Sequence, residues 1–169
     1  MKTEICTTIK SIPRDQWEAC RTSKASGDPF LSYDFFFLLE SSNSVGPSTG
    51  WVPFYITFKE KNLVVGIIVS FLKNHSQGEY VFDHSWADAY QRSGANYYPK
   101  LQVAVPFTPV SGERILVRPG NEKQLDEMIS STKRILRENN ISSLHITFCN
   151  KSFVNVAKKN RLLVREGIQ

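Results

Sequence analysis

The sequence lacks a long apolar run, a cysteine framework and a metal-binding motif. Its longest apolar stretch, residues 63–72, is interrupted by Gly66 and Ser70 and is too short to cross a bilayer, which takes about 20 residues. No apolar segment followed by small residues opens the chain, so we expect no secretory signal. The three cysteines show no CxxC spacing, which indicates reduced thiols in a cytoplasmic protein.

Internal repeats and low-complexity segments are also absent, and the composition is that of a globular protein. With 169 residues, 41% of them apolar and 22% charged, the chain predicts a single domain over residues 1–169. The net charge of +5 is uneven, because residues 121–169 carry nine basic and five acidic side chains. Such an excess is typical of a surface that attracts RNA, a nucleotide cofactor or a membrane, and equally of a solvated helix face.

Hydrophobic periodicity predicts an α+β domain in which strand–helix alternation is confined to the second half. Residues 60–62 separate two apolar runs and favour a β-hairpin. A further strand is expected through Lys100 and Gln102, whose side chains would share one face. The other predicted strands cover residues 3–9, 51–59, 63–73, 79–83, 113–118, 142–149 and 162–165.

Serine or asparagine precedes most of the predicted helices as an N-cap. These pairs are Ser11 before residues 13–20, Ser32 before 33–42, Asn121 before 122–138 and Asn150 before 151–157. Gln124 lies three residues after Asn121 and completes a capping box. A short helix is also expected over residues 85–90.

The most distinctive segment runs from Gly78 to Leu116 and reads GEYVFDHSWADAYQRSGANYYPKLQVAVPFTPVSGERIL. It places seven aromatic side chains among ionisable and amide groups. Polar tips on rigid apolar bodies suit a concave site that is both dry and chemically specific. We therefore expect a substrate-handling surface formed by Asp83, His84, Trp86, Asp88, Tyr97, Tyr98, Lys100, Gln102, Phe107 and Thr108.

Two segments, SNSVGPSTGW from Ser42 and YYPKLQVAVPFTPV from Tyr97, carry a family resemblance. The chain resembles a bacterial family of predicted N-acyltransferases labelled peptidoglycan biosynthesis/recognition proteins, which belong to the GNAT superfamily and are related to Fem-type peptidyltransferases. The resemblance implies a GNAT-like fold, with a central, mostly antiparallel sheet flanked by helices. Because family members are longer, it also implies an N-terminal half whose fold is incomplete at the C-terminus and which has a companion domain or chain.

The resemblance implies transfer of an acyl or aminoacyl group to an amine of a small molecule or cell-wall precursor, with acyl-CoA or aminoacyl-tRNA as co-substrate and no tightly bound cofactor. Such a transfer needs a proton acceptor for the amine and a donor for the leaving group. Asp83 or His84 is the candidate base, and Tyr97 or Tyr98 the candidate donor. The alternative is structural: Asp83 or Ser85 caps the following helix and His84 is merely hydrogen-bonded.

The remaining candidates concern binding. Lys100 is suited to a phosphate or carboxylate and Gln102 to an amide, unless both lie on a solvated face. Trp86, Asp88, Phe107 and Thr108 are expected to contact or shape the substrate site. Two glycine-containing turns are candidates for a coenzyme A phosphate loop, or simple turns; they contain Gln91 and Gly94, and Arg118 and Gly120. No metal ligation is expected, because neither HExxH nor a Cys/His spacing is present.

A second hypothesis is a non-catalytic recognition or scaffold domain that binds a peptidoglycan precursor or the companion half through the same aromatic surface. An open split between adjacent parallel strands would favour acyl-donor binding, whereas a split plugged by Phe107 or Trp86 would favour recognition. No DNA partner is expected, and an RNA-contacting role is the weakest reading, since the sequence contains no nucleic-acid-binding motif.

Overall fold

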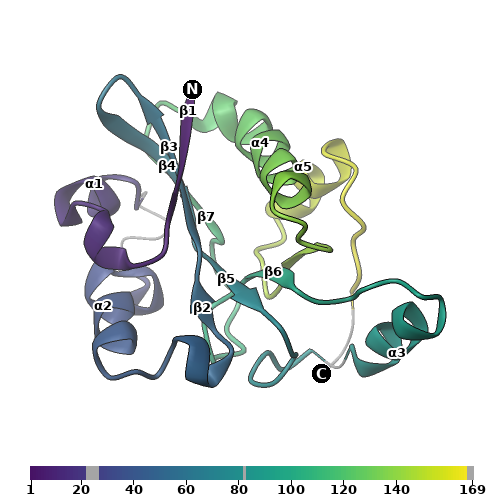
Figure 1. The fold of residues 1–169 in the computed structure, drawn as a ribbon. Helices are drawn as coiled ribbons and strands as arrows, with labels where there is room; N and C mark the ends of the chain where they lie inside the picture. Colours follow the sequence, from purple (N-terminus) through teal and green to yellow (C-terminus); the bar gives the residue numbers. More distant parts are fainter. Residues whose placement is uncertain (22–26, 82, 167–169) are drawn as a thin grey trace.

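The computed structural model of the chain describes residues 1–21, 27–81 and 83–166, and its strands form two four-stranded sheets (Figure 1). The first sheet has the order β1-β3-β4-β7 and is antiparallel. The second has the order β2-β5-β6-β8 and joins two antiparallel pairs to a parallel pair, β6 with β8. The strands are β1 Lys2–Cys6, β2 Val52–Pro53, β3 Tyr55–Glu60, β4 Leu63–Ile68, β5 Ser70–Lys73, β6 Lys100–Val103, β7 Ile115–Val117 and β8 Leu144–Ile146.

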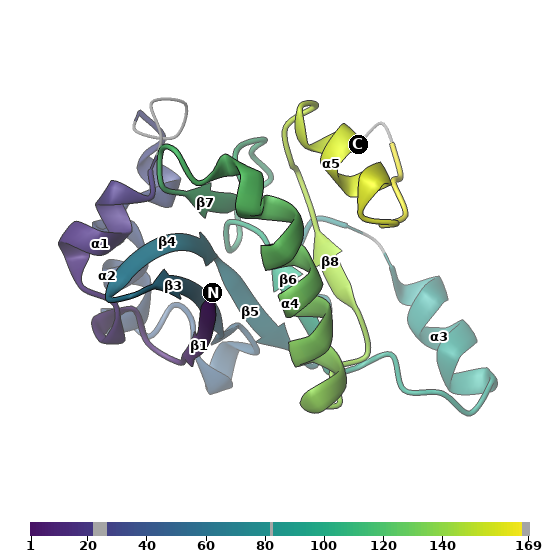
Figure 2. The same cartoon turned by 90° about the horizontal axis from the view of Figure 1, so that it is seen from above.

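Helices cover both sides of the sheets, which confirms the predicted α+β class. In Figure 2, α1 and α2 lie on one side and α4 and α5 on the other, whereas α3 projects away from the sheets. The α-helices are α1 Arg14–Ala19, α2 Tyr33–Ser41, α3 His84–Arg92, α4 Leu125–Glu138 and α5 Phe153–Lys159. Short 3-10 turns are η1 Ile9–Ser11, η2 Pro29–Leu31, η3 Pro47–Thr49 and η4 Glu122–Gln124.

A bent hairpin connects the two sheets. Strands β4 and β5 are separated only by Val69, and β2 and β3 only by Phe54. The Phe54 N–H donates to the Ser70 carbonyl over 2.9 Å, so the ribbon stays hydrogen-bonded where it passes from one sheet to the other. The hairpin predicted around residues 60–62 is therefore present, and each predicted long strand contributes to both sheets.

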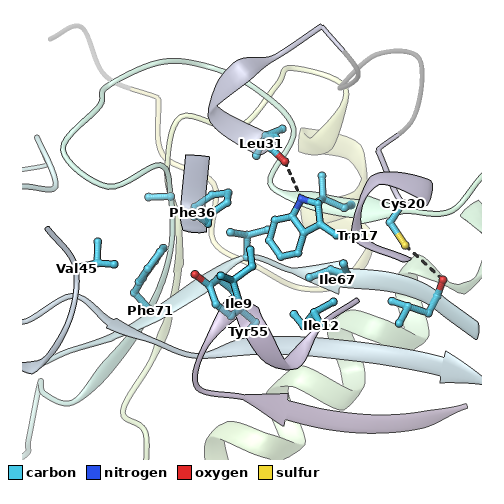
Figure 3. Packing of buried hydrophobic residues seen from close by; sticks show 14 of the residues in the cluster. Ile9, Ile12, Trp17, Cys20, Leu31, Phe36, Val45, Tyr55, Ile67 and Phe71 are labelled. Carbon is cyan, nitrogen blue, oxygen red and sulfur yellow. Dashed lines mark hydrogen bonds between the residues drawn. The ribbon is translucent and has the colours of Figure 1, made fainter. Parts of the chain in front are cut away.

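The core between the first sheet and helices α1 and α2 is built around Trp17 (Figure 3). The indole is fully buried, and its Nε1–H donates to the Leu31 carbonyl over 2.9 Å. Its ring centroid lies 5.4 Å from that of Phe36 and 5.7 Å from that of Tyr55. A second core packs the opposite sheet faces against α4, whose apolar stripe is buried at Met128, Ile129, Thr132, Ile135 and Leu136.

Of the predicted helix caps, only that at Ser32 is confirmed, where Oγ accepts from the Phe35 N–H over 3.2 Å. Ser11 lies within η1, and α1 begins after Pro13 without a side-chain cap. The capping box is absent because a 3-10 turn precedes α4 and Asn121 makes no cap bond. Asn150 likewise does not cap α5, since its amide donates to Glu113 over 3.0 Å.

Two predicted strands are wrong. Residues 79–81 and 83 form no strand, because Gly78 and Tyr80 adopt positive φ angles of 77° and 56° and turn the chain out of the extended conformation. Residues 162–165 have no regular secondary structure. Leu163 is 84% exposed there, so the alternating apolar residues do not form a sheet face.

Candidate active site

The ammonium group of Lys100 forms the centre of a buried polar network at the start of β6. Lys100 is fully buried, and its Nζ donates to Ser76 Oγ over 2.8 Å, Glu79 Oε2 over 2.7 Å and Asp83 Oδ2 over 2.6 Å. These three bonds use all the protons of the ammonium group. Ser76, Glu79 and Asp83 all belong to the segment between β5 and α3, so Lys100 fastens that segment to the second sheet.

Two tyrosines complete the network around Lys100. The Tyr97 hydroxyl donates to Asp83 Oδ2 over 2.7 Å, and the Tyr98 hydroxyl lies 2.8 Å from Ser76 Oγ. The Lys100 Nζ lies 5.4 Å from the Tyr97 ring centroid and 5.7 Å from that of Tyr98, which adds a cation–π contribution. Asp83, Tyr97, Tyr98 and Lys100, which the sequence singled out separately, therefore meet in one place.

A second lysine faces the same network. Lys73 pairs with Lys100 across β5 and β6, so both side chains project from the same face of the sheet. Its Nζ donates to the Gln77 carbonyl over 3.0 Å, and lies 3.9 Å from Glu79 Oε1 and 3.9 Å from the Trp51 ring centroid. Burial lowers the pKa of Lys73 to about 8, against the opposing attraction of Glu79.

The two carboxyl groups of the network have opposite pKa shifts. Burial raises the pKa of Glu79 above its usual value, and the bond from Lys100 only partly opposes this effect. Burial also acts to raise the pKa of Asp83, but the hydrogen bonds from Lys100 and Tyr97 outweigh it and hold that pKa below its usual value. Burial and the neighbouring Asp83 raise the pKa of Tyr97, so its hydroxyl stays protonated. Such divergence of neighbouring carboxyls is common at acid–base sites.

The polar face of the second sheet extends beyond the lysines to Gln102 and His145, which are paired across β6 and β8. Gln102 is fully buried, and its Nε2 donates to Thr147 Oγ1 over 2.9 Å. The His145 Nε2 lies 2.8 Å from Ser143 Oγ, and its ring contacts that of Tyr97 edge-on at 5.7 Å. Burial, reinforced by Lys100, lowers the pKa of His145 to about 4, so the imidazole is neutral at pH 7.

Three other predicted site residues lie outside the network. His84, Trp86 and Asp88 are exposed on α3, which projects from the domain (Figures 1 and 2). The Trp86 ring lies under the Arg165 guanidinium at 5.5 Å rather than in the sheet. The exposure of His84 removes the basis for its role as a base within this network. Asp83 occupies the N-cap position of α3, but its side chain makes no cap bond, because it is bound to Lys100 and Tyr97 instead.

The loop between β6 and β7 shapes one end of the polar face. Phe107 packs against Trp51 with ring centroids 5.3 Å apart, and Thr108 Oγ1 donates to the Pro106 carbonyl over 3.1 Å. Gly112 precedes β7 and Cys149 follows β8, so the parallel bridge between these two residues links the segments just before β7 enters the first sheet. Phe107 is 41% exposed, and Trp86, which contacts Arg165, is 45% exposed.

Neither predicted phosphate loop has a suitable environment for a pyrophosphate. Gln91 and Gly94 lie at the C-terminal end of α3, where the Gly94 N–H caps the Gln91 carbonyl; a helix C-terminus repels anions. Arg118 and Gly120 do lie between a strand and a helix. However, the Arg118 guanidinium is bound to the Val64 carbonyl and Gln16, and the Gly120 N–H donates to Glu122 Oε1 over 3.2 Å.

Acidic side chains also surround the start of α4, at Glu122, Asp126 and Glu127. A phosphate at this helix N-terminus would have to displace the Glu122 carboxylate and approach two further carboxylates. The residues present therefore do not fit the pyrophosphate of coenzyme A, and we assign no phosphate site here.

Sequence reasoning missed Lys73, Ser76, Glu79 and His145 as parts of the site. Lys73 lies two residues after Phe71, so the two side chains project from the same face of the strand. The residues before Lys73 are almost all apolar, and the lysine therefore did not stand out as a site residue. His145 had no visible partner, because only the parallel pairing of β6 with β8 brings it beside Gln102 and Tyr97. No local sequence signal reveals that pairing.

Replacing Lys100 tests the network. Lys100→Met is expected to lower the free energy of unfolding by about 3–5 kcal/mol, because Glu79 and Asp83 would be left buried beside an apolar chain. Chemical denaturation at pH 7 measures the difference. Lys158→Met, on the exposed surface of α5, is the matched control and should change stability by less than about 0.5 kcal/mol. Equal stability of the two variants would contradict the network.

The low pKa of His145 predicts a specific pH dependence. Between pH 6.5 and about 4, the unfolded state binds a proton at His145 that the folded state does not. Stability therefore falls as the pH decreases through this window, by up to about 3 kcal/mol at about 1.4 kcal/mol per pKa unit. Urea denaturation at pH 7 and 4.5 should show a smaller decrease for His145→Gln than for the wild type. An identical decrease for both proteins would mean that His145 has an ordinary pKa.

Within the described part of the chain, no helix is long and apolar enough to span a membrane, and no cluster of His, Cys, Asp and Glu is arranged to hold a metal ion. No curated protein matches the chain. Two solved structures of aminoglycoside N-acetyltransferases share its fold. One, AAC(6')-Iy in complex with CoA, has a TM-score of 0.55 and 12% identity, over 99% of this chain and 92% of that chain.

The other, meta-AAC0020 from an uncultured soil metagenomic sample in complex with sisomicin, has a TM-score of 0.52 and 14% identity, over 99% of this chain and 91% of that chain. The expected GNAT fold is thus confirmed. A family described as FemAB-like, peptidoglycan biosynthesis/recognition, matches residues 8–169. Because that match covers nearly the whole sequence, the chain belongs to the FemAB-like family.

Proposed function

We propose that this chain transfers an acyl or aminoacyl group to an amine in the metabolism of cell-wall precursors. The observation that carries the proposal is the buried network on the polar face of the second sheet, where Asp83, Tyr97 and Lys100 are in direct contact. The family description, peptidoglycan biosynthesis/recognition, and the fold of N-acetyltransferases support the same direction.

The network contains the groups that amide formation requires. The amine must lose a proton before its lone pair attacks the carbonyl carbon of an ester or thioester, and carboxylates are available to accept it. Tyr97 stays protonated and has an O–H that can be donated to the leaving oxygen or sulfur. Direct attack needs no covalent enzyme intermediate. The burial of these groups strengthens their electrostatic effect on the transition state.

The donor belongs to one of two chemical classes, an acyl thioester such as acyl-CoA or an aminoacyl ester of tRNA. The carboxylates at the start of α4 disfavour a pyrophosphate at that position, so an acyl-CoA would have to bind elsewhere. The basic excess in residues 121–169 supports an anionic donor or acceptor. Both donor classes therefore enter the assay.

We further propose that the reaction takes place in the cytoplasm and uses a companion domain or chain to complete the substrate channel. The three cysteines are free thiols, which is typical of a reducing compartment.

A second candidate is a recognition domain without catalysis, which one observation favours. Helix α3 exposes Trp86 and Tyr90 on a projecting element, and exposed aromatic side chains are enriched at interfaces. A cell-wall precursor or the companion domain would bind there, and the Lys100 network would then only hold the base of α3.

A transfer assay separates the two functions. The wild type is incubated with acetyl-CoA or aminoacyl-tRNA and an amine-bearing cell-wall precursor, and the amide product is measured by mass spectrometry. Asp83→Asn and Tyr97→Phe should each lower the turnover rate by about 100-fold, the size expected for loss of acid–base assistance. Tyr33→Phe, on α2 and away from the network, is the matched control.

Unchanged turnover in both site variants would remove the network from catalysis. Binding of the precursor to the wild type without any amide product from either donor would establish the recognition function instead.

A further inference from the structure

Strand β1 forms a free edge of the first sheet. Among the described strands it pairs only with β3, over its whole length from Lys2 to Cys6. Its outer side therefore presents backbone N–H and C=O groups that can pair with a further strand. Two apolar side chains at this edge, Met1 and Ile5, are 37% and 40% exposed. A strand added to the edge would cover both.

Lys2 and Glu4 place opposite charges along the edge. Residues two apart in a strand lie on the same face, and Lys2 Nζ lies 2.7 Å from Glu4 Oε1, with side chains that are 72% and 33% exposed. Lys59 of β3 also binds Glu4, over 2.5 Å. These two lysines lower the pKa of Glu4 to about 2, so its carboxylate is charged at neutral pH.

Within its own sheet, Lys2 is paired with a like charge. The residue directly opposite it on β3 is Lys59, and like charges in that position are destabilising. A carboxylate directly opposite Lys2 on its outer side would offset this repulsion. The edge thus favours a partner strand that carries an acidic residue at that position.

Symmetry restricts how a second copy of β1 can fit the edge. A twofold axis perpendicular to the sheet joins two β1 strands antiparallel, with the same face of each sheet on the same side. Because side chains alternate between the faces, such an axis must pass through a residue and not between two residues. The central residue of the pair is then Thr3, Glu4 or Ile5.

The register centred on Thr3 is complementary in charge and in polarity. It places Lys2 opposite Glu4 of the second copy, twice over. Thr3 then lies opposite Thr3, and the exposed Met1 lies opposite the exposed Ile5. Opposite charges and paired threonines both stabilise cross-strand neighbours. A centre at Glu4 would instead put two carboxylates face to face, and a centre at Ile5 would leave Glu4 without a lysine opposite it.

We propose that β1 pairs antiparallel with β1 of a second copy of this chain, about a twofold axis at Thr3, and so joins two first sheets into one. Lysine at a sheet edge also serves to block pairing in monomeric proteins. In this register, however, Lys2 meets a carboxylate, so its charge attracts the second copy. The Lys100 network lies in the second sheet, and the pairing is therefore independent of the proposed transfer reaction.

Sedimentation velocity measures the association. Five residues pairing with five bury much less than the roughly 1,600 Å² of a standard interface, so the dimer should be weak. Untagged wild type is therefore examined from about 1 µM to 1 mM, the span of weak affinities. It should change from monomer to dimer as its concentration rises.

Charge reversal tests the paired residues. Lys2→Glu and Glu4→Lys should each weaken the dimer by at least about tenfold, because like charges replace both opposite-charge pairs. Lys158→Glu, exposed on α5, is the matched control and should associate as the wild type does. An equimolar mixture of Lys2→Glu and Glu4→Lys, both folded by circular dichroism, should associate again, since each acidic residue then faces a lysine.

Cysteine cross-linking tests the register. Thr3→Cys places two thiols directly opposite each other, with Cβ atoms about 4.5–5.5 Å apart, and mild oxidation should yield a disulfide-linked dimer. In Ile5→Cys the thiols are about 14 Å apart, and in the wild type those of Cys6 are about 20 Å apart, so neither should cross-link.

Four outcomes would each overturn the pairing. They are a wild type that stays monomeric at every concentration, unchanged association in Lys2→Glu, a mixture of folded charge variants that does not associate, and cross-linking through Ile5→Cys in preference to Thr3→Cys.

Discussion

The buried ammonium group of Lys100 is the interaction on which the rest of the site depends. It binds three side chains from the segment that precedes α3, and through Asp83 it also fixes the Tyr97 hydroxyl. Buried ion pairs contribute little net stability compared with an apolar core of the same volume. Loss of one partner is nevertheless costly, because it leaves the other charges buried and unpaired, here on a sheet whose opposite face is apolar.

The two-sheet architecture explains how such a network stays dry. The hairpin that contains β4 and β5 passes from the first sheet into the second at Val69, so one sheet is anchored by the Trp17 core while the other presents Lys73 and Lys100. Helix α4 packs behind both sheets. The segment that carries Glu79 and Asp83 lies against the polar face on the other side, where both residues bind Lys100.

Sequence patterns predicted the secondary structure well where apolar periodicity was long, as in the hairpin around residues 60–62 and the helix over residues 122–138. They failed where a prediction rested on a short alternating segment or on a single cap residue. The alternating residues 79–83 suggested a strand, but positive φ angles at Gly78 and Tyr80 turn the chain so that Glu79 and Asp83 point to one lysine. Local cap signals at Ser11, Asn121 and Asn150 were overridden by 3-10 turns and tertiary hydrogen bonds.

The candidate site was predictable in composition but not in geometry. Asp83, Tyr97, Lys100 and Gln102 stand out in the sequence, whereas the exposed His84 and Asp88 stood out equally. The tertiary structure distinguishes the two groups: the pairing of β5, β6 and β8 brings Lys73, Lys100, Gln102 and His145 to one face, and α3 leaves His84 and Asp88 exposed. Long-range strand pairing leaves no local trace in the chain, which is why Lys73 and His145 were missed.

The most direct measurement is a carboxyl carbon NMR titration that follows Glu79 and Asp83 individually in the folded protein, with signals assigned from Glu79→Gln and Asp83→Asn. We expect an Asp83 pKa below 3.8 and a Glu79 pKa above 4.5, the ordinary values for the two groups. Such a split would establish that Lys100 holds one carboxylate as an anion while burial leaves the other able to take up a proton. Ordinary pKa values for both groups would contradict the buried network.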